Sequence, residues 1–264
     1  MSTAITVMSF NIRGAYWKGD GVNYWPQRAA LNVAMLERLG SDVIGFQEFQ
    51  DGNMEIYARS LAGYHWSLGP RYGHHPPFEY PAIAWRPERL RLCGSGGFWL
   101  SETPERHSES WQTACIRSAQ WARFQSVRGG PCWLMLNTHL DHESALARLE
   151  GTQLILRRLQ GLKMPGEAAI ITGDFNCDPD TPPYAAFQQA SYQDTFVLAG
   201  DQHAPSYTYH GFHGSTYKLK GGRSERIDWI LTQGMQPRLC EIVRDEAPPR
   251  YPSDHYPVLA WFEC

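Results

Sequence analysis

Short apolar runs alternate with amphipathic stretches along the chain, and this alternation predicts an α/β protein. Ile5–Phe10 is the first buried strand that the pattern predicts, and it ends at Asn11. An apolar stripe at helical spacing follows over Pro26–Gly40, and Asp42–Phe46 is a second strand, followed shortly by Glu48. A strand–helix–strand unit of this kind places Asn11 and Glu48 at equivalent strand ends.

The rest of the chain interleaves helices, strands and turns. The pattern predicts an antiparallel middle section and a long loop, rich in Gly, His and Tyr, over residues 199–224. Two mixed sheets packed face to face, with helices outside, accommodate this order better than one doubly wound sheet does. The other predicted strands are Pro81–Trp85, Leu90–Cys93, Trp121–Val127, Trp133–Thr138, Ala168–Thr172, Ile227–Leu231 and Pro257–Phe262, and the other predicted helices are Met54–Ala62, Ala145–Leu159 and Pro183–Ala190.

The composition favours one folded domain over residues 1–264. Apolar residues make up 42% of the chain and aromatic residues 13%, which is enough for a large core, and no linker or charge block divides the sequence. The start of the chain lacks the basic region of a secretory leader, and no apolar run is long enough to span a membrane. We therefore expect a cytoplasmic protein. Its six scattered cysteines, with no CxxC pair, then predict reduced thiols and no zinc site.

Polar side chains gather where the predicted strands begin or end. Asp, Asn and His at such an edge suit phosphoester hydrolysis, because a carboxylate can orient water, an amide can donate to phosphoryl oxygens and an imidazole can stabilise developing charge. Asp228 lies inside an apolar run, where a carboxylate needs a partner, and His255 is the natural candidate. The other residues of this set are Asn11, Glu48, His139, Asp174, Asn176 and Asp254.

Each of these residues also has an ordinary structural interpretation. Asp174-Phe175-Asn176 can form a turn, Asn11 can cap a strand, and Glu48 can be a solvated strand end. His139 can be a buried histidine that a hydrogen bond satisfies. The ordered occurrence of the whole set favours a shared site over these separate interpretations.

Six strings of the sequence resemble the motifs of the endonuclease/exonuclease/phosphatase superfamily, whose members are deoxyribonuclease I-like. The strings occur in the family's order and span nearly the whole chain. The run Phe98-Trp99-Leu100-Ser101-Glu102-Thr103-Pro104 further resembles the compact bacterial branch of the superfamily. The six strings are Ser9-Phe10-Asn11-Ile12-Arg13, Gly45-Phe46-Gln47-Glu48, Asn137-Thr138-His139-Leu140-Asp141, Gly173-Asp174-Phe175-Asn176, Arg226-Ile227-Asp228-Trp229-Ile230 and Ser253-Asp254-His255-Tyr256-Pro257-Val258.

The resemblance implies a four-layer α/β-sandwich and a divalent metal, usually Mg²⁺, with Mn²⁺ as an alternative. Glu48 would be the principal metal ligand, with Asn11 and Asp254 near the ion or its waters, because Mg²⁺ keeps several waters and takes few protein carboxylates. Asp174 would then orient and deprotonate the attacking water. The other implied roles are donation to phosphate oxygens by Asn176 and His139, and stabilisation of the pentacovalent state by His255 paired with Asp228.

Three further residues are candidates for binding the substrate. Arg13 and Arg117 match positions where relatives often carry arginine, and a guanidinium is suited to holding phosphate. Surface salt bridges are the alternative interpretation of both. Glu79 follows Phe78, where related bacterial chains usually have glycine, so its role is carried over less directly.

The superfamily implies the class of reaction and leaves the substrate open. The net charge of −3, and a single basic segment over residues 217–226, favour a small phosphorylated metabolite such as a sugar phosphate. The alternatives are a nuclease of the exonuclease, deadenylase or abasic-site type, a lipid headgroup hydrolase, and an inactive binding module. No amphipathic or long apolar insertion supports a membrane partner, and the sequence leaves the oligomeric state undetermined.

Overall fold

Two six-stranded mixed sheets form the centre of the computed structural model, which describes residues 4–219, 221 and 223–263. The first sheet has the strand order β11-β12-β1-β2-β4-β3 and the second β5-β6-β7-β8-β10-β9. The strands of the first sheet are β1 (Ala4–Asn11), β2 (Val43–Phe49), β3 (His65–Leu68), β4 (Tyr80–Trp85), β11 (Pro237–Ile242) and β12 (Val258–Glu263), and those of the second are β5 (Leu90–Trp99), β6 (Ser118–Ser126), β7 (Trp133–His139), β8 (Ala168–Asp174), β9 (Gln193–Asp194) and β10 (Asp228–Gln233).

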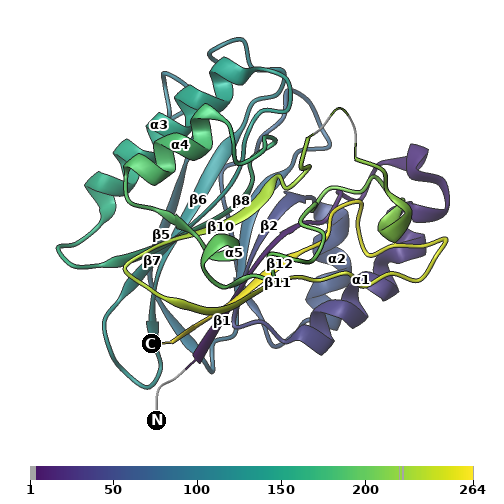
Figure 1. Cartoon of the computed structure of the whole chain (residues 1–264), viewed down its shortest axis with the longest axis horizontal. Coiled ribbons are helices and arrows are strands. Elements are labelled where there is room, and N and C mark those ends of the chain that lie inside the picture. The colour runs from purple at the N-terminus through teal and green to yellow at the C-terminus, as the bar shows by residue number, and fades with distance from the viewer. Residues whose placement is uncertain (1–3, 220, 222, 264) are drawn as a thin grey trace.

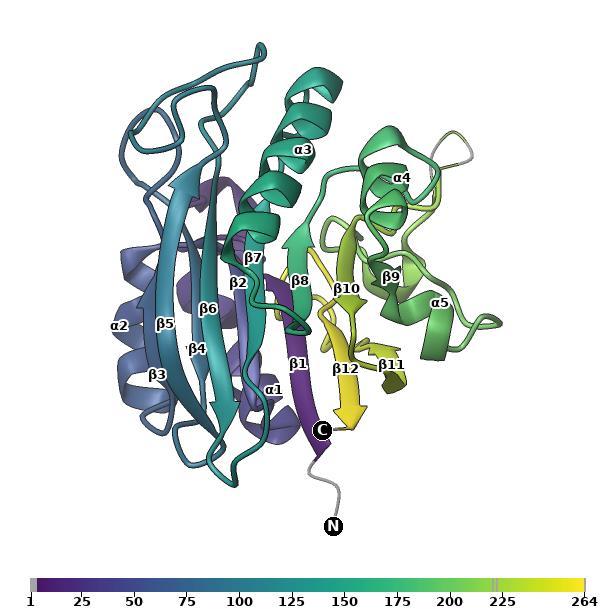
Figure 2. The same ribbon diagram turned by 90° about the vertical axis from the view of Figure 1, so that its left-hand side faces the viewer.

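Helices cover the outer faces of both sheets, so the described chain forms four layers. Two of them, α1 and α2, lie against the first sheet, while α3 and α4 lie against the second (Figures 1 and 2). Apolar side chains from both sheets, including Val7, Val43, Met135 and Ile170, form the core between them. This is the sandwich with helices outside that the sequence predicts. The helices are α1 (Trp25–Leu39), α2 (Asp51–Ser60), α3 (Ala145–Leu162), α4 (Pro182–Gln189) and α5 (Thr195–Ala199), and the 3₁₀ turns are η1 (Lys18–Asn23) and η2 (Gly214–Thr216).

The two sheets share one local topology, and it brings the predicted site together. Each contains a parallel pair, β1 with β2 and β7 with β8, and each pair is flanked by antiparallel strands. The carboxyl ends of the parallel strands therefore meet the beginnings of β12 and β10 at one edge. In the register of the second sheet, Asp174 faces His139 on one side and Asp228 on the other.

A buried polar seam joins the sheets beneath this edge. The amide of Asn137 donates to the backbone oxygens of Phe46 (2.7 Å) and Ala82 (3.1 Å), and its oxygen accepts from Gln47 (2.7 Å). Gly45 leaves room for this approach, because a Cβ there would lie 2.3 Å from Thr172 Oγ1. The two sheets are thus held in a fixed relation where the site forms.

Several element boundaries differ from the sequence-based predictions for identifiable reasons. The strand predicted at Leu90–Cys93 continues to Trp99, because glycines interrupt its apolar alternation without ending its pairing with β6. The helix predicted from Met54 begins at Asp51, since Gln50 and Asn53 form a reciprocal capping box. The chain also contains β3, β9, β11 and α5, which are too short or too polar for the pattern to indicate.

Residues 1–3, Lys220, Gly222 and Cys264 lie outside the described residues. The expectation of a reduced thiol at Cys264, and part of the basic segment over residues 217–226, therefore lie outside them too. Five cysteines within the described ranges, Cys93, Cys115, Cys132, Cys177 and Cys240, carry free thiols. Within those ranges, no helix combines the length and the apolar character needed to cross a bilayer.

Candidate active site

A cavity of about 620 Å³ opens at the edge where the strand ends meet. We call the strand-end residues Asn11, Glu48, His139, Asp174, Asp228 and His255 its floor, and the loop residues Trp17, Cys115, Tyr209, Phe212 and Glu225 its wall. Asn11 and Asp228 support the floor from beneath, and the other floor residues line the cavity. Its lining residues are Arg13, Trp17, Asp20, Glu48, Glu79, Cys115, Arg117, His139, His142, Asp174, Asn176, Tyr209, Gly211, Phe212, Arg223, Glu225, Ile227, Asp254 and His255.

Asp174 and Glu48 are joined through Asn11 at the centre of the floor. The Asn11 amide donates to Asp174 Oδ2 (2.8 Å) and to Glu48 Oε1 (3.0 Å), and its oxygen accepts from the backbone N–H of Arg13 (3.0 Å). The second oxygen of Asp174 accepts from the backbone N–H of Asn176 at 2.9 Å. Asp174 is therefore held from two sides, with its carboxylate at the cavity.

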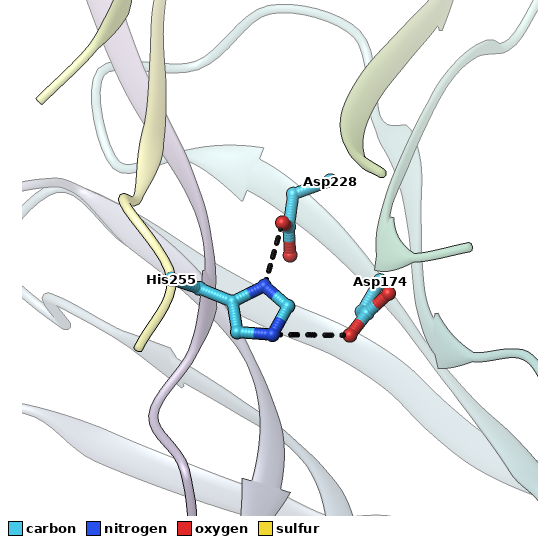
Figure 3. A group of neighbouring side chains, drawn as sticks. All are labelled: Asp174, Asp228 and His255. Atoms are coloured by element: carbon cyan, nitrogen blue, oxygen red, sulfur yellow. Dashed lines mark hydrogen bonds and ion pairs between the residues drawn. The ribbon is translucent and has the colours of Figure 1, made fainter. Parts of the chain in front are cut away.

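His255 lies between two carboxylates (Figure 3). Its Nδ1 is 2.8 Å from Asp228 Oδ2, and its Nε2 is 3.8 Å from Asp174 Oδ2. Burial opposes the charged imidazolium, but the charge and hydrogen bond of Asp228 outweigh it and raise the pKa of His255 to about 10. Burial, and next the charge of Asp228, raise the pKa of Asp174 to about 7. The predicted Asp228–His255 pair is thus present in the geometry.

One potential ligand atom from each of Asp174, Asp228 and His255 lies within 4.8 Å of the other two, so this group could also hold a metal ion. Asp228 is only 1% exposed and lies behind His255, and its Oδ2 already forms a hydrogen bond with His255 Nδ1. This pairing favours a role for Asp228 in orienting the imidazole over a role of the three residues as metal ligands.

Glu48 has the features of a metal ligand. Its Oε1 accepts from Asn11, whereas its Oε2 is buried without a hydrogen-bond partner among the described residues. A carboxylate oxygen of this kind, at a cavity that Asp254 also lines, suits a hard cation such as Mg²⁺ or Mn²⁺. The backbone N–H of Glu48 donates to Tyr72 Oη at 2.8 Å, and this bond helps to fix the backbone from which the Glu48 side chain extends. The residues present therefore fit the implied metal.

Arg117 orients His139. Its Nη1 lies 3.1 Å from His139 Nδ1, and since a guanidinium can only donate, Nδ1 is the acceptor in this contact. Burial, together with the charge of Arg117, holds the pKa of His139 well below its usual value, so the ring is neutral. His139 Nε2 is 3.4 Å from Asp174 Oδ2 and 2.9 Å from the amide nitrogen of Asn176, so donors approach both ring nitrogens. Arg117, Asn176 and Asp174 thus fix the orientation of the His139 ring at the cavity.

Glu79 and Arg13 complete the charged lining. Arg117 Nη1 lies 3.8 Å from Glu79 Oε2. Burial raises the pKa of Glu79 to about 7, and the nearby charge of Glu48 adds to this. Arg13 forms an ion pair with Asp20 (3.1 Å) and lies 3.7 Å from Asp254. Both arginines thus reach the cavity already paired with carboxylates.

Backbone strain is concentrated at this site. Eight non-glycine residues within the described ranges have positive φ, and five of them line the cavity. Left-handed backbone costs energy in residues with a Cβ and commonly marks functional positions. The five are Arg13 (53°), Glu48 (56°), Asn176 (50°), Phe212 (60°) and Glu225 (50°).

Two buried polar side chains hold the loops around the cavity. Arg28 of α1 is fully buried and donates to the backbone oxygens of Asn23 (2.8 Å), Pro252 (2.7 Å) and Gly14 (3.0 Å), and also to that of Arg13. Burial lowers the pKa of Arg28 to about 10, although nearby carboxylates oppose this. Arg28 therefore ties the chain after β1 to the chain before Asp254 and His255.

Asp141 anchors the segment that leads to Arg117. Its carboxylate is 2% exposed and accepts five hydrogen bonds between 2.6 and 3.0 Å. Oδ2 accepts hydrogen bonds from the Thr113 hydroxyl and from the backbone N–H groups of Ala114 and Cys115. Oδ1 accepts hydrogen bonds from the backbone N–H groups of Glu143 and Ser144. Loop 113–115 is thereby fixed to the chain after His139.

The eleven residues proposed from the sequence all lie in or directly beneath the cavity. Sequence reasoning indicated the wall only through the long loop over residues 199–224, which supplies Tyr209 and Phe212. It did not identify Glu225, His142 or Arg28 as site residues, and it did not predict that Asp141 anchors loop 113–115. Arg28 carried a faint signal, since it is a charged residue within the first helix beside an apolar stripe.

Comparison with known proteins agrees with this fold and identifies the family. The model of the Endonuclease/Exonuclease/phosphatase family matches residues 8–255. The chain is similar to a solved endonuclease/exonuclease/phosphatase from Bacteroides vulgatus (27% identity, 99% of each chain, TM-score 0.89) and to a mannosyl-6-phosphatase from Bacteroides thetaiotaomicron (28%, 97% of this chain and 98% of that one, TM-score 0.86). The catalytic domain of human Nocturnin shares the fold (20%, 98% and 93%, TM-score 0.76). No curated protein gives a significant match.

Proposed function

The chain belongs to the endonuclease/exonuclease/phosphatase family, a family of phosphoester hydrolases, and we propose that it is a divalent-metal-dependent phosphatase acting on a small phosphorylated metabolite such as a sugar phosphate. The observation that carries the choice of substrate is the charge around the cavity. Six carboxylates line it, against three arginines. The carboxylates are Asp20, Glu48, Glu79, Asp174, Glu225 and Asp254, and the arginines are Arg13, Arg117 and Arg223.

Each lining arginine already has a carboxylate partner. Arg13 pairs with Asp20 at 3.1 Å, Arg117 lies 3.8 Å from Glu79, and Arg223 lies 3.6 Å from Asp178. A polynucleotide depends on several phosphate contacts outside the reacting group, and an acid-rich lining opposes them. One phosphate, held by the metal and the floor, is compatible with this surface. The likeness to a mannosyl-6-phosphatase supports the same choice.

Glu48 would hold the divalent cation through its unpartnered Oε2, with Asp254 on the same cavity and Asn11 behind. The bound cation would supply positive charge to the phosphate oxygens. Asp174, fixed by Asn11 and Asn176, would orient water and accept its proton, for which a raised pKa is favourable.

The two histidines, whose Nε2 atoms lie 3.4 and 3.8 Å from Asp174 Oδ2, would act on the phosphate oxygens. His139, which is neutral, and the Asn176 amide would donate to non-bridging oxygens. His255, kept as an imidazolium by Asp228, would stabilise the charge that grows on the phosphate oxygens. Arg117 would act through His139, whose ring it orients, and Arg13 would bind at the outer edge of the phosphate.

A substrate panel tests this proposal. Sugar phosphates, nucleotides, cyclic phosphates, single-stranded RNA and abasic DNA are assayed with Mg²⁺ and with Mn²⁺ at low and high salt. We expect the highest kcat/KM for a sugar phosphate, with weak dependence on salt. The aromatic wall residues Trp17, Tyr209 and Phe212 could instead stack on a base, which keeps a nuclease as the second candidate. Efficient, salt-sensitive cleavage of an oligonucleotide with sugar phosphates untouched would establish the nuclease.

A further inference from the structure

Glu225 is a largely buried residue of the cavity wall whose carboxylate the mechanism above does not use. It lines the cavity, yet the residue is only 7% exposed. Within the described ranges its carboxylate forms neither a hydrogen bond nor an ion pair, and the nearby Arg223 pairs with Asp178 instead. The buried side-chain oxygens without a partner in the described ranges do not include those of Glu225, so its carboxylate reaches the open space of the cavity, where a ligand can pair with it.

The backbone on both sides of Glu225 is held in place. Ser224 donates from its hydroxyl to Asp178 Oδ1 (2.7 Å), and Arg226 pairs with Asp194 at 2.7 Å. The backbone oxygen of Glu225 itself accepts from the N–H of Thr208 at 2.9 Å. With a φ of 50°, Glu225 also occupies the left-handed region that glycine adopts without strain. The side chain is therefore presented by a rigid, strained segment.

We propose that Glu225 forms a hydroxyl-binding subsite, in which its carboxylate accepts hydrogen bonds from the leaving group of the phosphoester. A carboxylate only accepts, so it pairs with hydroxyl groups and repels a second phosphate. Tyr209 and Phe212 line the same cavity and offer apolar ring faces to the carbon skeleton of a sugar. The occupant that fits is an uncharged polyol ring carrying one phosphate. This inference rests on the proposed function and makes it more specific.

Two substrates with the same type of leaving oxygen test the subsite. Mannose 6-phosphate and cyclohexylmethyl phosphate are both esters of primary alcohols on six-membered rings, but only the first carries ring hydroxyls. The quantity measured is the ratio of their kcat/KM values in the wild type, Glu225→Gln and Glu225→Gly. We expect the wild type to favour the sugar phosphate and the ratio to fall about tenfold to hundredfold in both variants, because hydrogen bonds to a charged acceptor are lost.

The glycine variant separates binding from folding. Glycine relieves the strain at φ 50°, so Glu225→Gly should melt at a higher temperature than Glu225→Gln while losing the same selectivity. Ser191→Gly is the matched control, because Ser191 is exposed, has a φ of 65° and lies outside the cavity. It should gain stability and keep the wild-type ratio.

The possible failures are distinguishable. A wild-type ratio retained in both folded Glu225 variants overturns the subsite and leaves the proposed phosphatase intact. A wild type that prefers cyclohexylmethyl phosphate also overturns the subsite alone. A selectivity change confined to nucleotides assigns Glu225 to base N–H groups and overturns the hydroxyl assignment. A wild type without activity on any phosphoester overturns both proposals.

Discussion

The floor and the wall of the cavity are built in different ways. Five floor residues lie at or near the ends of paired strands, and His255 lies just before β12. Their side chains bond to one another, as Asn11 does to Asp174 and His255 to Asp228 (both 2.8 Å). Wall residues come from connecting segments and range in exposure from Glu225 at 7% to Trp17 at 46%. The sheets can thus keep the reacting groups in place while the loops around them vary in sequence. We expect the floor to set the chemistry and the wall to set the substrate.

The wall is nonetheless not free to move. Arg28 joins the chain after β1 to the segment before His255, and Asp141 joins loop 113–115 to the chain after His139. Both anchors bond mainly to backbone groups, which places a loop without specifying its side chains. The contrast therefore predicts that the effect of a substitution on turnover decreases from the floor to the anchors.

Glu48→Gln should have the largest effect on turnover. Glutamine keeps the shape and can still accept from Asn11, but it removes the negative charge from the buried, unpartnered oxygen that would hold the cation. Hydrolysis of the best substrate at ordinary Mg²⁺ should fall below detection, while the melting temperature in metal-free buffer stays nearly the same. Excess chelator should likewise abolish hydrolysis by the wild type. Full activity of the wild type in excess chelator would show that the reaction needs no metal ion and that Glu48 is not a metal ligand.

Asp174→Asn should follow, with a loss of about 10²–10⁴-fold in kcat. The amide preserves the side chain's size but cannot accept the proton of the attacking water. Steady-state kinetics separates two roles, because loss of a base lowers kcat whereas loss of a binding contact raises KM. A rise in KM alone would make Asp174 part of substrate binding and end its assignment as the base.

The floor could be predicted from the sequence because its residues occupy fixed places in short strings. Asp174 and Asn176 follow an apolar run directly, and a strand end is a place that periodicity can locate. Glu225 and Arg28 could not be found this way. Their roles depend on contacts across the fold, such as Arg28 to Pro252, and on backbone torsions that no pattern of residue types encodes. The four missed short elements likewise owe their pairing to tertiary context.

Arg28→Ala tests the first anchor and should reduce kcat about tenfold to a hundredfold. It leaves the buried backbone oxygens of Asn23 and Gly14 without their donor and removes one of the two donors to that of Pro252, so the loops carrying Arg13 and His255 lose their mutual position. The assay is run well below the variant's melting temperature, and low guanidinium chloride should restore part of kcat. Arg38→Ala, on the exposed face of α1, should show neither effect. An unimpaired kcat in folded Arg28→Ala would limit this residue to stability.

Asp141→Asn should have the smallest effect on catalysis and a clear effect on stability. Asparagine keeps one acceptor oxygen and turns an NH₂ group toward N–H donors, so two or three of the five hydrogen bonds are lost, at a cost of about 2 kcal/mol at neutral pH. Burial alone would raise the pKa of Asp141, but these donors outweigh it and lower the pKa.

The sign of this shift fixes how the stability difference depends on pH. The stabilisation is complete above the ordinary carboxyl pKa of about 4 and is lost as the pH falls through the lower pKa of the folded state. Denaturation of wild type and Asp141→Asn should therefore show a gap at pH 7 that narrows in acid. Glu143→Gln, whose side chain is 73% exposed, is the control and should show no such gap. A gap of constant size down to low pH would mean that the shape of Asp141, and not its charge, holds loop 113–115, and the wall would then lack its second electrostatic anchor.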